Sequence, residues 1–161
     1  PDPVAGTAAH AWYWSGSGTN ATGSYSINGW LYYYETKETD GISQWIGAAD
    51  RDKFFQKDSA IRFPSTTPFF MDALWPDTWP KKEDMPPTDL YLGLVNSSLG
   101  RITLARHPLQ KVRTRQNDPL PSSIDMSYAD GHAAKIRLQD IKRPTWHLGY
   151  LPIGNPWKTT P

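Results

Sequence analysis

The sequence predicts an α+β fold that is mostly β: an antiparallel sheet connected by long proline-rich loops. Its 161 residues include 15 Pro spread along the whole chain, and each Pro fixes φ and removes a backbone donor, which excludes many long helices. The 8 Trp and 8 Tyr are residues that pack well on a pleated sheet. One segment alternates apolar and polar residues on both sides of an Asp-Gly pair, the pattern of a β-hairpin. We expect one β-rich domain with a core of large aromatic rings.

The hairpin pattern extends from Ile124 to Leu138. A two-residue loop at Asp130-Gly131 would place Met126 opposite Lys135 and mix apolar and charged side chains on one face. A three-residue loop with Gly131 in the left-handed conformation avoids this mixture, so we expect the longer loop. The cross-strand pairs would then be Tyr128 with His132, Met126 with Ala134, Ile124 with Ile136 and Asp125 with Lys135.

Three regions of the chain differ in composition. Residues 1–23 are mostly small and polar, and their few aromatic residues suggest an extended arm docked by its rings. Residues 24–150 form the β-rich domain, and residues 151–161 form a C-terminal tail. The arm and the tail are therefore expected to depend on the central domain for their contacts.

Within the domain, three further strands are expected, at Tyr25–Tyr34, Phe69–Met71 and Leu99–Ala105. The first could turn at Asn28-Gly29, and the second is short and apolar enough to be buried. The third alternates, which predicts that Ile102 and Leu104 point inward and that Arg101 and Thr103 point outward.

A short helix and three loops complete the expected elements. Asp50–Asp58 begins with capping residues, Asp50 or Asp52, and places Phe54 and Phe55 inward. Glu35–Gly41 is a polar loop, and residues 107–122 form a Pro-interrupted one. Residues 75–89 contain too many prolines for a regular element and are expected to be a surface loop pinned by Trp75 and Trp79.

Charge is unevenly distributed along the chain. Residues 1–99 carry 7 Lys and Arg against 12 Asp and Glu, a net charge of −5, whereas residues 100–161 carry 10 against 4, a net charge of +6. Solvated charges often cluster in this way by chance. Alternatively, the acidic part of one copy attracts the basic part of the next. The basic residues between Arg101 and Arg115 lack interleaved aromatic rings, so we do not expect nucleic-acid binding.

Several function classes are excluded or disfavoured. The chain has no Cys, which excludes disulfides, thiolate catalysis and Cys-ligated metals. No apolar run approaches the roughly 20 residues that span a bilayer. The only string near a G-x-S-x-G nucleophile motif lies in the polar arm rather than between a strand and a helix. We therefore expect a protein that is not an enzyme.

Five motifs follow one another in an order that resembles a known family. The segment Leu120–Ile124 followed by Met126–His132 is similar to the closing signature of the prepilin-type H-X9-DG proteins. These are pseudopilin-like proteins related to the major pseudopilins of type II secretion and common in planctomycetes and verrucomicrobia. The other matches are Ser24–Trp30, Pro64-Ser65 with Phe69–Ala73, Ala105–His107, and Leu138–Ile141 with Trp146-His147. One departure is the spacing between His107 and Asp130, which is 22 residues instead of nine.

The resemblance implies the β-rich head of a pilin or pseudopilin, a subunit of a type IV pilus-like or secretion pseudopilus-like filament. It also implies a prepilin cleavage site and a long apolar helix upstream of this sequence. That helix would anchor the precursor in the inner membrane and would be the chain's only membrane contact. The expected partners are copies of the chain itself and, as a variant, a separate helical subunit. The expected location is the cell surface, the extracellular space or the periplasm.

The expected site residues are mainly structural. The motif residues are Asp72, Arg106, His107, Asp130, Gly131 and His132. We expect Asp130 to form a turn, His107 to hydrogen-bond at a strand end and Asp72 to cap a loop. No cofactor is expected except calcium, which the heads of type II pseudopilins often hold. The candidate oxygen ligands here are Asp118, Asp125 and Asp130. The alternative function is a carbohydrate-binding module that stacks sugars on exposed indoles, with Trp75 and Trp79 as the candidates.

Overall fold

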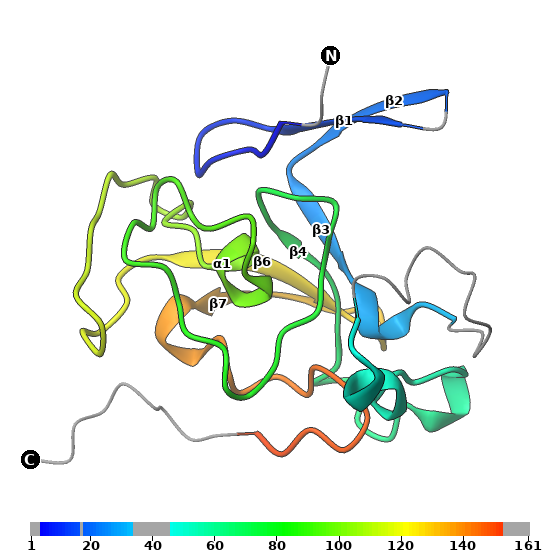
Figure 1. Ribbon diagram of the computed structural model, residues 1–161. Helices are drawn as coiled ribbons and strands as arrows, with labels where there is room; N and C mark the ends of the chain where they lie inside the picture. The colour runs from blue at the N-terminus through cyan, green and yellow to red at the C-terminus, as the bar shows by residue number, and fades with distance from the viewer. Residues whose placement is uncertain (1–3, 17, 34–45, 153–161) are drawn as a thin grey trace, which may run out of the picture.

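The computed structural model describes residues 4–16, 18–33 and 46–152, which form a mostly β fold with two sheets (Figure 1). The predicted fold class is confirmed. A two-stranded antiparallel sheet pairs β1 (Trp12–Gly16) with β2 (Thr19–Gly23). The five-stranded sheet has the order β5-β3-β4-β6-β7, and only its β3–β5 pair is parallel. Its strands are β3 (Tyr25–Asn28), β4 (Pro68–Asp72), β5 (Asp77–Thr78), β6 (Ser123–Tyr128) and β7 (Ala133–Arg137).

Helices are short in the described part of the chain. The α-helix is α1 (Ser98–Ile102), and short 3₁₀ helices cover Gly29–Leu31, Ala48–Lys53, Asp58–Ala60 and Leu138–Asp140. None of these helices has the length and apolar character needed to cross a membrane.

The hairpin formed by β6 and β7 has the predicted register. Ile124 lies opposite Ile136, Met126 opposite Ala134, and Asp125 opposite Lys135. The Tyr128 backbone N–H donates to the His132 carbonyl over 2.9 Å, and Gly131 has φ +92°. The three-residue loop and its left-handed glycine are therefore confirmed.

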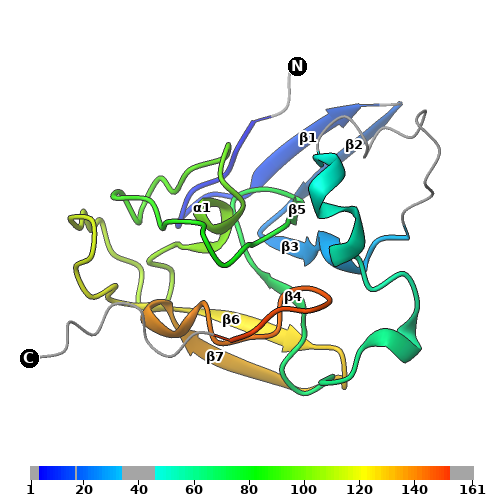
Figure 2. The ribbon, with the colours of Figure 1, turned by 60° about the horizontal axis from the view of Figure 1, so that its bottom comes forward.

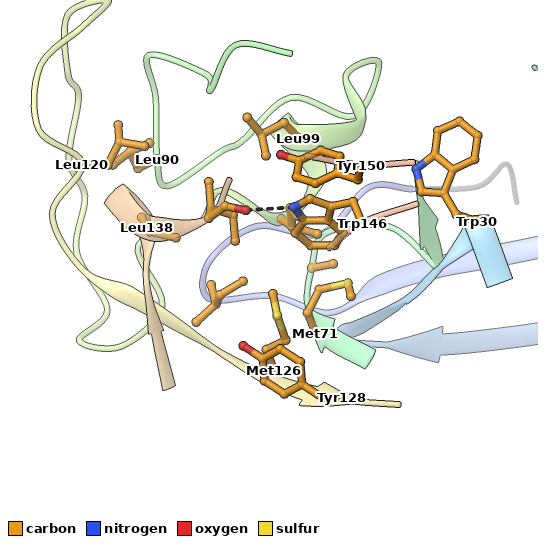
Figure 3. Close-up of a cluster of buried hydrophobic side chains, with 14 of the residues drawn as sticks. Trp30, Met71, Leu90, Leu99, Leu120, Met126, Tyr128, Leu138, Trp146 and Tyr150 are labelled. Atoms are coloured by element: carbon orange, nitrogen blue, oxygen red, sulfur yellow. Dashed lines mark hydrogen bonds between the residues drawn. The ribbon is translucent and has the colours of Figure 1, made fainter. Parts of the chain in front are cut away.

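The core lies on the face of the five-stranded sheet to which Met71 and Met126 point, and it is rich in aromatic rings, as the composition predicts. Trp30 and Trp146 are both fully buried. The Trp30 indole N–H donates to the Pro80 carbonyl over 3.0 Å. The Trp146 N–H donates to the Ile141 carbonyl over 2.9 Å, the bond dashed in Figure 3. Both bonds allow a large apolar ring to be buried without leaving a polar atom unsatisfied.

The segment after β7 covers this core. In Figure 2 it is coloured orange to red and runs across β6 and β4. Trp146 belongs to this segment and packs in one cluster with Met71 and Met126. The Asn28 side-chain amide donates to the Trp146 carbonyl over 2.9 Å, so the end of β3 also holds the segment in place.

Several predicted elements need correction. The predicted strand Leu99–Ala105 is wrong because α1 occupies most of it and Thr103 is fully buried instead of outward. Phe69 and Phe70 lie in β4 as predicted but are 38% and 46% exposed, so the strand is not buried at those residues. The predicted helix Asp50–Asp58 is replaced by two separate 3₁₀ turns without a side-chain cap, although Phe54 and Phe55 are buried as expected.

The N-terminal region differs from an extended arm because it folds back as the β1–β2 hairpin. It does dock through its aromatic rings: the Trp12 indole donates to the Tyr25 carbonyl, and the Trp14 ring lies edge-on to Trp75 at 5.5 Å. Strand β3 ends at the predicted Asn28-Gly29 turn, and β5 is a two-residue strand inside the predicted 75–89 loop. The predicted loop at Glu35–Gly41, residue Tyr34 and most of the 151–161 tail lie outside the described residues.

Candidate functional site

Asp72, the last residue of β4, is the centre of the candidate site because its carboxylate is almost completely buried. Its residue exposure is 2%, and a buried charge is costly unless donors surround it. Arg106 Nη1 lies 3.1 Å from Oδ1, and His107 Nε2 lies 2.9 Å from Oδ2. The backbone N–H of Asp125 donates to the same Oδ2 over 2.8 Å. Three elements distant in the sequence therefore meet at one carboxylate.

Arg106 connects this carboxylate to the N-terminal region. Its Nη2 donates to the Thr7 carbonyl over 2.8 Å, and its Nη1 donates to the Ser24 carbonyl over 2.8 Å. A longer contact of 3.4 Å reaches the Ala73 carbonyl. A planar guanidinium can donate hydrogen bonds to several acceptors at once. A lysine ammonium on its flexible stem is less suited to this arrangement. We call Asp72 and Arg106, with the carbonyls of Thr7 and Ser24, the Asp72–Arg106 bracket.

His107 is held beside the bracket and faces two carboxylates. Its backbone N–H donates to the Ser123 carbonyl over 3.0 Å. Its Nε2 is 2.9 Å from Asp72 Oδ2 and 3.4 Å from Asp125 Oδ2, and its side chain is 34% exposed. One ligand atom from each of Asp72, His107 and Asp125 lies within 4.8 Å of the others. In the described part of the chain this is the one group of three or more His, Asp or Glu residues close enough to hold a metal ion.

The other three motif residues form a separate group at the tip of the hairpin. Asp130 Oδ1 accepts from the His132 backbone N–H over 3.1 Å and contacts His132 Nδ1 at 2.6 Å. These hydrogen bonds hold the pKa of the exposed Asp130 below its usual value. The His132 ring also stacks on Tyr128 at 4.3 Å, and burial raises the pKa of Tyr128 to about 12. Asp130 therefore acts in the turn, as predicted, and His107 contacts Asp72 instead of this tip.

The three calcium candidates are not brought together. Asp118 accepts from the Arg115 backbone N–H over 2.8 Å in the 107–122 loop, and Asp130 lies at the hairpin tip. Asp125 alone joins the Asp72–His107 group. Sequence reasoning named all three residues of this group but missed their contact. The contact follows from the register of β4 and β6. Met71 pairs with Met126, so the next pair, Asp72 and Asp125, lies on the face of the sheet opposite to these methionines.

Trp75 and Trp79 are both partly buried and are not the exposed pair expected from the sequence. The Arg101 guanidinium lies 5.7 Å from the Trp75 ring centre and 5.9 Å from that of Trp79. Burial lowers the pKa of Arg101, which also pairs with Asp77 at 3.1 Å. The neighbouring Trp14 is 39% exposed but stands at 79° to Trp75, so these indoles do not form a coplanar platform.

In the described part of the chain, arginines of the basic part form ion pairs with carboxylates of the acidic part. Arg101 pairs with Asp77, Arg106 with Asp72 and Arg113 with Asp89, at 3.1, 3.1 and 2.9 Å. In each pair the carboxylate comes from residues 1–99 and the arginine from residues 100–161. The charge asymmetry of the sequence is therefore used, at least in part, to hold the fold together.

Comparison of the chain with protein-family models, with curated proteins and with solved structures found no match. Functional inference therefore depends on the fold, the Asp72–Arg106 bracket and the Asp72–His107–Asp125 group. Both contacts of the His107 Nε2 are carboxylates, a pattern of ion pairs or metal ligands rather than of a nucleophile with its base.

Proposed function

We propose that this chain is the globular head of a subunit of a type IV pilus-like or type II secretion pseudopilus-like surface filament, and that it is not an enzyme. Its partners in this proposal are other copies of the subunit, with or without a separate helical subunit. The proposal places the head outside the inner membrane, joined to the membrane only through an N-terminal helix of the precursor. In this proposal the surface of the whole head, rather than a substrate pocket, contacts the neighbouring subunits.

The observation that carries the proposal is the contact between two of the motifs on which the family resemblance depends. Asp72 belongs to the Phe69–Ala73 motif, and Arg106 and His107 belong to the Ala105–His107 motif. Their side chains meet although the residues are 34 and 35 positions apart. The elements of a fold vary less among relatives than the loops that connect them, so a contact between the two motifs supports the head fold that the resemblance implies.

The carbohydrate-binding alternative has less support. Sugar recognition by stacking needs exposed ring faces, and Arg101 lies over both Trp75 and Trp79. Trp30 and Trp146 are fully buried in the core. These four indoles therefore serve packing, which favours an assembly subunit over a glycan-binding module.

The test is to locate the native protein and to read its coding sequence upstream of Pro1. We expect a prepilin-type cleavage site followed by an apolar helix of about 20 residues, and antibody labelling of filaments or of the cell surface. Deleting the prepilin peptidase should leave the unprocessed precursor in the inner membrane. A coding sequence with an ordinary secretion signal and no such helix, together with protein that stays processed in the deletion strain, would refute the filament proposal.

A further inference from the structure

The group formed by Asp72, His107 and Asp125 has the donor types and spacing of a mononuclear metal site. Zinc bound to imidazole nitrogen and carboxylate oxygen has bonds near 2.0–2.2 Å, so tetrahedral ligand atoms lie about 3.3 Å apart. The His107 Nε2–Asp125 Oδ2 distance is 3.4 Å, and the His107 Nε2–Asp72 Oδ2 distance is 2.9 Å. The second distance would need to open by a few tenths of an ångström, and the ligand oxygens of Asp72 and Asp125 lie within 4.8 Å of one another.

The surroundings of these ligands are already arranged to hold them. Asp72 Oδ1 is held by Arg106 and Asp72 Oδ2 by the Asp125 backbone N–H, so the buried carboxylate has a fixed orientation. Such outer contacts orient ligating carboxylates in metal sites. Asp125, in contrast, is half exposed, with 51% of its side chain accessible, and His107 is 34% exposed. An ion would therefore be reached from solvent on one side, where water could complete its coordination.

The donor set also distinguishes between classes of metal. Calcium takes six to eight oxygen ligands, and this group offers two carboxylates and a nitrogen. Imidazole suits zinc and other first-row transition ions, and zinc can bind three protein ligands with a water in the fourth position. The two carboxylates and the Arg106 cation leave one net negative charge, which a divalent ion would offset.

We propose that Asp72, His107 and Asp125 bind one divalent transition-metal ion, with Zn²⁺ preferred over Ca²⁺. His107 Nε2 and one oxygen of each carboxylate are the ligands. The ion would replace the direct His107–Asp72 hydrogen bond and would join the end of β4, strand β6 and the first residue of the 107–122 loop. This site is independent of the filament proposal and uses one of the three carboxylates that the sequence singled out for calcium.

The experiment measures zinc binding to the metal-free chain by calorimetry and by metal analysis after dialysis, with calcium titrated in parallel. We expect one zinc per chain, a higher melting temperature with zinc, and little effect of calcium. His107→Gln and Asp125→Asn should each weaken zinc binding by at least about tenfold. Asp125→Asn changes a half-exposed side chain and keeps its backbone N–H, so it preserves the fold if His107→Gln does not.

The matched control is His132→Gln, because His132 and Asp130 form an exposed imidazole–carboxylate pair elsewhere on the same domain. This variant should bind zinc as the parent chain does. Absence of stoichiometric zinc binding, equal loss in His132→Gln and His107→Gln, or tighter binding of calcium than of zinc would each overturn the proposal.

Discussion

Gly131 shows how one residue fixes the hairpin that organises the sheet. Its φ of +92° lies where side chains with a Cβ are strained, and an added Cβ would meet no atom within 4 Å. The cost of a substitution is therefore backbone strain alone. Gly131→Val should lower the free energy of unfolding by about 1–2 kcal/mol, measured by urea denaturation.

Asp130→Asn is the control for that prediction. The amide oxygen of Asn can still accept from the His132 backbone N–H, so stability should change little. If this variant kept its stability but lost a bound ion or an activity, Asp130 would be a ligand or catalytic group and its role as a turn former would be wrong.

His147 should make stability depend on pH. It is 7% exposed, lies 5.3 Å from the Trp30 ring and 5.0 Å from the Tyr150 ring, and its Nδ1–H donates to the Leu148 carbonyl over 2.8 Å. Burial is the main cause that lowers its pKa below 6.5. The unfolded chain therefore binds this proton at a higher pH than the folded chain does. As a result, His147 lowers the free energy of unfolding as the pH falls from about 7 to 5.

The measurement compares urea midpoints at the two ends of that pH range in the parent chain and in His147→Gln. The variant should lose less stability on acidification. Burial raises the pKa values of Asp77 and Asp84, so their titration acts in the opposite sense, and only the difference between variant and parent isolates His147. If the stability difference between the two pH values were the same in His147→Gln as in the parent, the assignment to His147 would be wrong. The control is His10→Gln, which changes an exposed histidine and should behave as the parent does.

At the scale of elements, the β6–β7 hairpin could be predicted and α1 could not. In the hairpin, alternation, turn chemistry and an opposite-charge pair all favour one register. Around α1 the pattern is ambiguous, because Leu99 and Ile102 have helical spacing while Ile102 and Leu104 have strand spacing. The ambiguity is resolved by Ser97, whose hydroxyl accepts from the Gly100 N–H and caps the helix, and by the burial of Leu99, Gly100 and Ile102 within it.

The candidate site was predictable in its residues and not in its contacts. Asp72, Arg106 and His107 stand out through the family resemblance, but the 22-residue spacing between His107 and Asp130 carries no information on which carboxylate His107 meets. That choice depends on the pairing of β4 with β6, which places Asp72 and Asp125 side by side. Register between strands distant in sequence is set by the whole core, and local pattern does not determine it.

The Asp72–Arg106 bracket predicts a large difference between two arginines of the same chain. Arg106→Lys keeps the charge but cannot donate to Asp72, Thr7 and Ser24 at the same time. It should therefore lower the free energy of unfolding by about 2–4 kcal/mol. Arg113→Lys should change stability by less than about 0.5 kcal/mol, because the Arg113 side chain is 83% exposed in its pair with Asp89. Urea denaturation of both variants tests this. Equal losses would mean that the bracket contributes no more than a surface ion pair.

At the scale of the whole molecule, the structure changes the interpretation of the charge asymmetry. The sequence leaves open whether the −5 and +6 parts attract one another between copies. Three carboxylates of the acidic part instead form ion pairs with arginines of the same chain: Asp72, Asp77 and Asp89. These pairs reduce the charge that could attract another copy of the chain. Lys111 is also engaged within the chain, 5.4 Å from the Tyr91 ring centre.

The pairing of charges within the chain bears on how assembly depends on salt. If the halves neutralise each other inside each head, and if an apolar helix joins the subunits, then filaments should persist as ionic strength rises from low to near-molar salt. Screening acts on exposed charges beyond about 8 Å at physiological ionic strength and leaves apolar packing intact. Sedimentation and electron microscopy of native filaments across this range would measure the effect. If the filaments instead came apart as the salt concentration rose and the screening length fell, attraction between charges on different copies would hold the filament together. The interpretation suggested by the sequence would then be correct.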